Sequence, residues 1–122
     1  MGNITNSKQV RKREFPDVTI YTLGKPAQAG TPQEVLVEIA PHGAVPLHAH
    51  RTDAKMIIVA GSGIVLSADQ SMHGTPVGRG DSVFFEAEVP HGFQAFGAGL
   101  TFLSQNGGIV DERESEWDVS FT

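Results

Sequence analysis

Residues 41–63, PHGAVPLHAHRTDAKMIIVAGSG, decide how this chain folds. The stretch alternates small and apolar residues around His48 and His50, and it ends in a Gly-Ser-Gly turn signal. Side chains two apart on a strand point to the same face, so both imidazoles leave one side of a sheet. Their Cα atoms are then roughly 6.5 Å apart, and two imidazole nitrogens can bind one ion at about 2.1 Å each. The pair is a candidate metal site, with a pair of surface histidines as the alternative.

Turn-forming residues occur throughout the chain, which contains 14 glycines and seven prolines. No segment shows a sustained helical period with a cap at its start, so we predict an all-β fold. We interpret Gly61-Ser62-Gly63 as a tight reversal between two strands. Short strands separated by turns are typical of a sandwich or barrel. The predicted strands are 18–23, 34–39, 45–50, 55–60, 63–67, 75–77, 82–85, 92–96 and 100–104.

The length of 122 residues indicates a single domain, 1–122, with a real core. Residues 1–16 have little periodicity, and we expect them to form an N-terminal arm. A chain of this size gains stability from an interface, so we also expect a homodimer.

Composition excludes several classes of function. The net charge of −5 argues against nucleic acid as the main partner, since phosphate neutralisation needs a basic face. No apolar run approaches the about 18 residues of a membrane span. The N-terminus has basic residues but no hydrophobic segment after them, so we expect a cytoplasmic protein without a secretory signal. Without cysteine, a metal must be held by nitrogen and oxygen ligands.

A third histidine strengthens the metal hypothesis. His91 lies in Val89-Pro90-His91-Gly92-Phe93, after a predicted turn and an apolar strand. Together with the His48 and His50 pair, it resembles the two paired motifs of the cupin superfamily. His48, His50 and Gly61 keep the spacing of the first motif, and Gly80 and His91 keep the spacing of the second. The resemblance covers roughly residues 43–96.

This resemblance implies a jelly-roll barrel, the double-stranded β-helix, made of two antiparallel sheets. It also implies that His48, His50 and His91 converge on a divalent metal inside the barrel. Iron, manganese, zinc and nickel all suit three histidines, and the ligand set does not choose among them.

The sequence departs from the family pattern where the first motif has a liganding glutamate. Counting from His50 places Ala54 or Lys55 there, and neither can supply a carboxylate. Glu86 and Glu88 stand where the second motif has Pro and Gly, and Ala95 replaces its Asn. Three neutral imidazoles leave a divalent ion its full charge, so the open positions should attract anions or chelating enolates. If Lys55 pointed inward, it would instead indicate a metal-free, anion-binding pocket.

Strand parity suggests which residues line the pocket. If Ala54 faces inward, Met56 and Ile58 share its face, and Phe93 and Gln94 are further candidates; ordinary core packing is the alternative for all of them. We therefore expect a small organic ligand or substrate. Three-histidine cupins include dioxygenases, so the resemblance admits an iron dioxygenase, with isomerase or lyase chemistry as a second option. A non-catalytic module that binds or senses a small ligand is the alternative from another class.

Overall fold

The computed structural model describes residues 11–23, 33–106 and 119–121, which form nine strands and no helix. In this part of the chain, no helix is long and apolar enough to cross a membrane. The all-β prediction is confirmed. The strands are β1 Arg11–Phe15, β2 Val18–Leu23, β3 Gln33–Ile39, β4 Ala44–His50, β5 Ala54–Ser67, β6 Pro76–Gly78, β7 Ser82–Phe85, β8 His91–Asn106 and β9 Val119–Phe121.

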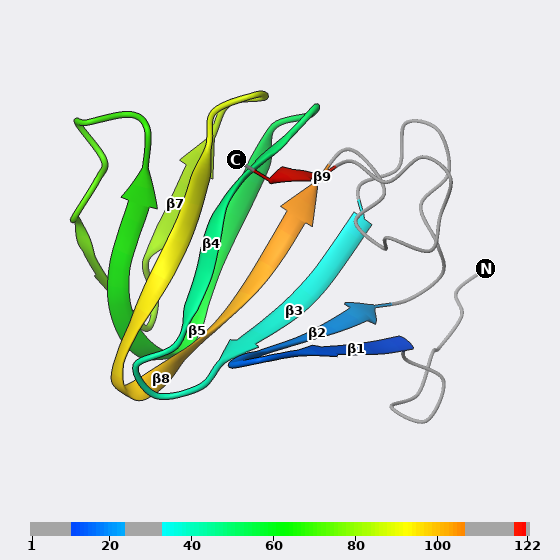
Figure 1. Cartoon of the computed structure of the whole chain (residues 1–122), viewed down its shortest axis with the longest axis vertical. Helices are drawn as coiled ribbons and strands as arrows, with labels where there is room; N and C mark the ends of the chain where they lie inside the picture. Colours follow the sequence, from blue (N-terminus) through cyan, green and yellow to red (C-terminus); the bar gives the residue numbers. More distant parts are fainter. Residues whose placement is uncertain (1–10, 24–32, 107–118, 122) are drawn as a thin grey trace.

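Two long strands, β5 and β8, belong to both layers of the barrel. The first half of β8 pairs with β4 and with the second half of β5. The second half of β8 pairs with β3 and with the first half of β5. In Figure 1 the halves of β8 are yellow and orange arms that meet at a bend. All pairings are antiparallel, as expected for a jelly-roll barrel.

The prediction of a tight reversal at residues 61–63 is wrong, because β5 continues through these residues with a change of register. Gly61 has a φ of 78° and Gly99 has a φ of 76°, and each lies at the bend of its strand. A Cβ atom on Gly61 would lie 2.1 Å from the carbonyl oxygen of Gly99. Glycine is therefore needed for close backbone approach within a bulged strand, which has the same sequence signal as a turn.

The core lies between the two layers and follows the alternation of the strands. Along β5, Ala54, Met56 and Ile58 are buried, while Lys55 is exposed. Phe93 on β8 contributes a large aromatic ring that is 1% exposed. Fully burying an apolar side chain of this size stabilises the fold by about 1.5–3 kcal/mol relative to exposure.

Strands β1 and β2 form a hairpin at one edge of the sheet (Figure 1). Asp17, at the turn, has a φ of 66°, a conformation that Asp adopts more readily than most residues. Its carbonyl oxygen accepts a hydrogen bond of 2.8 Å from the Ala40 amide, which ties the hairpin to the loop before β4. Part of the expected N-terminal arm, 11–15, is thus a strand of this chain's own sheet, and residues 1–10 lie outside the described residues.

Candidate metal centre and adjoining cavity

The structure brings three histidines together from two adjacent strands. His48 on β4 lies directly opposite His91 on β8, in a stretch where the register shifts between Val45 and His48. Their ring centroids are 4.6 Å apart, and the ring of His50 lies 5.2 Å from that of His48 and 5.3 Å from that of His91. One nitrogen from each ring lies within 4.8 Å of the others. Convergence therefore follows from strand pairing, which the sequence spacing alone does not show.

Two backbone carbonyl groups fix the tautomers of His48 and His91. Nδ1 of His48 donates to the carbonyl oxygen of Pro46 at 2.8 Å, and Nδ1 of His91 donates to that of Val89 at 2.9 Å. A neutral imidazole that donates from Nδ1 carries its lone pair on Nε2. The buried Nε2 atom of His91 has no hydrogen-bond partner among the described residues. This is the arrangement that a metal-ligating histidine needs.

Burial also keeps these rings neutral. The pKa of His91 is lowered to about 3, chiefly by burial and also by the nearby His48 and His50 rings, against the opposing effect of the Val89 hydrogen bond. Burial likewise lowers the pKa of His48, and the hydrogen bond to Pro46 opposes the shift. Protonated imidazoles cannot bind a metal, so low pKa values favour the ligating form at neutral pH.

His91 is the most firmly held of the three. It is 1% exposed, and its ring stacks on Phe85 with centroids 4.1 Å apart and planes only 6° from parallel. Phe85 is equally buried and belongs to β7, which pairs with β5. Packing from a third strand therefore fixes the orientation of this imidazole.

No carboxylate joins the three histidines in the described part of the chain. Ala54, at the position of the family's glutamate, faces inward and is 1% exposed. Lys55 is exposed and so does not enter the site. Asp53 is exposed as well, and its carboxylate accepts a hydrogen bond of 2.9 Å from the Ala87 amide. The site is therefore a set of three imidazole nitrogens without a carboxylate.

These residues fit a divalent metal ion. Two nitrogens bound to one ion at about 2.1 Å are at most about 4.2 Å apart, so small rotations of the side chains would bring all three within binding distance. Such a set suits zinc, iron, manganese or nickel and leaves coordination positions open to another molecule.

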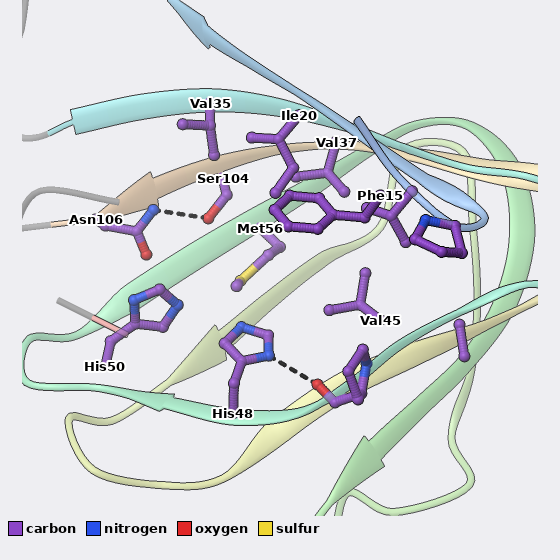
Figure 2. A pocket seen from close by; sticks show the side chains of 14 residues that line it. Phe15, Ile20, Val35, Val37, Val45, His48, His50, Met56, Ser104 and Asn106 are labelled. Atoms are coloured by element: carbon purple, nitrogen blue, oxygen red, sulfur yellow. Dashed lines mark hydrogen bonds between the residues drawn. The ribbon is translucent and has the colours of Figure 1, made fainter. Parts of the chain in front are cut away.

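A cavity of about 280 Å³ adjoins the histidines inside the barrel (Figure 2). His48, His50, Ser104 and Asn106 are its polar residues, and none of the described residues that line it is charged. Most of its wall is hydrocarbon. The apolar lining residues are Phe15, Pro16, Val18, Ile20, Val35, Val37, Ala44, Val45, Pro46 and Met56.

Of the five pocket residues predicted from parity, Met56 lines this cavity. Ala54, Ile58 and Phe93 are buried in the core but are not among the lining residues. Gln94 lies apart, and its amide donates to the carbonyl oxygens of His42 at 2.7 Å and Gly43 at 3.1 Å. Ala54, Ile58 and Phe93 contribute to packing, because inward parity puts a residue in the core without bringing it to the cavity. Gln94 has the opposite parity and anchors the loop before β4.

Sequence reasoning missed Asn106 and Ser104, at the end of β8. Both share the inward parity of Phe102, and both are buried. The amide nitrogen of Asn106 donates to the Ser104 hydroxyl oxygen at 2.9 Å. Their parity with a buried aromatic residue was the available signal, but both lie beyond the stretch that resembles the family motifs.

Comparison with known protein families gives one match, to the model described as a cupin domain, over residues 35–103. A search of curated proteins finds no significant match.

Solved structures with the same fold include enzymes. The polyketide cyclase RemF from Streptomyces resistomycificus superposes with a TM-score of 0.72 and 23% identity over 87% of this chain and 79% of that one. An RmlC-like cupin from Shewanella frigidimarina superposes with a TM-score of 0.71 and 18% identity, over 87% of this chain and 90% of that one. Oxalate decarboxylase from Bacillus subtilis superposes with a TM-score of 0.76 and 21% identity. The match covers 99% of this chain but only 33% of the decarboxylase chain. At these identities the likeness establishes the fold.

Proposed function

Because this chain belongs to the family of cupin domains, we propose that it is a metal-dependent enzyme that acts on a small, mainly apolar molecule with an oxygen donor. The observation that carries the proposal is the position of His48 and His50 in the wall of a mainly apolar cavity. A ligand in this cavity would place one end against the metal ligands and its body against hydrocarbon. Small-molecule sites commonly combine apolar walls with a few polar groups in this way.

The lining of the cavity indicates the class of substrate. A short dicarboxylate bound to the metal would leave most of the apolar wall without a contact, and none of the described lining residues is Lys or Arg to add a charged partner. Oxalate, the substrate named for one structural neighbour, is therefore a poor candidate here. A 1,3-diketone or its enol on an aromatic body suits both the apolar wall and an electron-poor metal. The likeness to a polyketide cyclase of similar size supports this choice.

A divalent ion held by the three histidines would supply Lewis-acid chemistry to a substrate oxygen, or oxygen activation if the ion is iron. The chain's own residues do the rest. His48 and His91 present Nε2 lone pairs because their Nδ1 protons are held by backbone carbonyls. Met56 and Val37 exclude water from the cavity wall, which strengthens every polar interaction at the site.

The first experiment is metal analysis of the purified protein, followed by loading with iron, manganese, zinc or nickel. Each form is incubated with 1-phenyl-1,3-butanedione, and loss of the enol absorbance is followed under air and under argon. We expect a stoichiometric metal and turnover. Turnover only under air would identify an oxygenase, while turnover under argon would identify an isomerase or lyase.

The His48→Ala variant should lose both metal and turnover, because it lacks one of three ligands. The His73→Ala variant is the matched control, since His73 is exposed and its ring accepts a hydrogen bond from the Ser67 amide outside the cavity. Metal-free protein that still binds the diketone without converting it would contradict the enzyme and support the non-catalytic module.

A homodimer is part of the proposal. Phe84 on β7 is 54% exposed, and among the described strands β7 pairs only with β5. A second copy could cover this apolar side chain. Sedimentation analysis of wild-type protein and the Phe84→Glu variant checks this, and a monomeric wild-type protein would contradict it.

A further inference from the structure

Asn106 is a buried polar side chain that the proposed function leaves without a role. It is 1% exposed and lines the same cavity as His48 and His50. Its side-chain carbonyl oxygen, Oδ1, has no hydrogen-bond partner among the described residues. Nearly all buried polar atoms in folded proteins are hydrogen-bonded, because an unsatisfied acceptor loses its hydration without compensation. Among the described residues, the cavity therefore lacks a hydrogen-bond donor for Oδ1 of Asn106.

The amide of Asn106 is held in one orientation. Its nitrogen donates to the Ser104 hydroxyl oxygen at 2.9 Å, and Ser104 is itself buried, two residues earlier on the same face of β8. With the nitrogen used in this way, the oxygen is left on the other side of the amide. Figure 2 shows that oxygen pointing into the cavity, toward the end where His50 lies.

The missing carboxylate makes room for this arrangement. Ala54 on β5 lies directly opposite Asn106 on β8, and directly opposed residues share one face of a sheet with Cβ atoms about 5 Å apart. A glutamate at position 54 would compete with the amide for the same space. With a methyl group there, Asn106 is the polar group next to the position of the family's acidic ligand.

We propose that Asn106 determines ligand specificity by accepting, through Oδ1, a hydrogen bond from a hydroxyl group of the bound molecule. The site would then select alcohols, phenols or enols on an apolar body over ethers of the same shape. A cationic donor such as an ammonium group is disfavoured, because none of the described lining residues is acidic. This inference rests on the proposed function for the place of the ligand beside the histidines.

The test uses two probes that differ in a single donor, 2-naphthol and 2-methoxynaphthalene. Both are titrated calorimetrically into the full chain loaded with zinc, and the ratio of their dissociation constants is compared between variants. We expect wild-type protein to prefer 2-naphthol. In Asn106→Leu, which keeps the size but removes the acceptor, the preference should fall about five- to tenfold.

Three further variants separate this role from a structural one. Asn106→Asp keeps an acceptor at the same place and should retain the preference. Ser104→Ala removes the group that orients the amide and should lower the preference in part. Gln105→Leu is the matched control, because Gln105 lies one residue along β8 and its amide donates instead to Glu34 at 3.0 Å on the surface.

An unchanged preference in folded, zinc-loaded Asn106→Leu would overturn the inference, and so would binding of neither probe or a wild-type preference for the ether. If Asn106→Leu does not fold, Ser104→Ala decides, and an unaltered ratio there rejects the idea. Zinc content separates the two proposals. A preference that depends on Asn106 in protein that takes up no metal would support this inference and reject the metal-dependent function.

Discussion

The two ends of the cavity differ in polarity and in exposure. At the inner end, His50 is 6% exposed and Asn106 is 1% exposed. At the other end lies Phe15, which is exposed and purely apolar (Figure 2). Buried side chains in most proteins are mainly apolar, yet this cavity has polar groups at its buried end, beside hydrocarbon such as Met56. The inner end is suited to binding a metal and a polar group, because a low dielectric strengthens both interactions. The outer end is suited to selecting a ligand by its shape.

The largest effect on metal binding should come from removing one imidazole from the inner end. In His91→Ala we expect metal affinity to fall by at least about 100-fold, beyond the 10–100-fold typical of losing only an outer partner of a ligand. The measurement is metal retention against a competing chelator. His73→Ala serves as the control. Stoichiometric metal retained by folded His91→Ala would show that the three rings do not act as one ligand set.

A carboxylate added at the inner end should strengthen metal binding there. In Ala54→Glu, a negative charge would cancel one unit of the metal's charge, so we expect metal affinity to rise about tenfold. Because position 54 is fully buried, the same change should destabilise metal-free protein by about 1–3 kcal/mol.

Chelator competition and denaturant unfolding, each with and without metal, measure the two effects. Ala60→Glu, on an exposed position of the same strand, is the control and should change neither by much. Unaltered metal affinity in folded Ala54→Glu would indicate that the side chain at position 54 cannot reach the histidines.

The smallest expected effect comes from the outer end. In Phe15→Ala, loss of a ring that is 42% exposed should weaken 2-naphthol binding about fivefold, since only part of its area is removed from water by the ligand. Metal retention should not change. Phe96→Ala, at 43% a comparably exposed phenylalanine away from the cavity, is the matched control. A change in metal retention in Phe15→Ala would mean that the two ends are not independent.

Much of this architecture follows from local sequence. Alternating side chains and turn residues predict β2 and β7 with their observed bounds. The all-β class follows too, because no segment has helical periodicity. The resemblance to cupins identifies His48, His50 and His91, and their proximity follows once β4 and β8 pair. These features depend on short-range patterns, which one sequence displays directly.

The features that sequence reasoning missed depend on contacts between distant strands. Glycine signals both a turn and a bulge, so Gly61 did not show that β5 continues. Phe15 belongs to a segment without periodicity, and it reaches the cavity only because the β1 and β2 hairpin extends the sheet beside β3. Asn106 pairs with Ala54, which lies 52 positions earlier in the sequence. Such cross-strand neighbours are fixed by register, which a single chain does not reveal.

The sharing of β5 and β8 between the two layers has a consequence for how the molecule opens. A sandwich of two separate sheets can part along the gap between them, whereas here β5 and β8 pair with each other on both sides of the bends at Gly61 and Gly99, so both layers share the same two strands. Amide protons in both halves of β5 and β8 should therefore exchange with solvent together, in the slowest group of the chain. The edge hairpin of β1 and β2 joins the sheet only through β3, so we expect its amide protons to exchange faster.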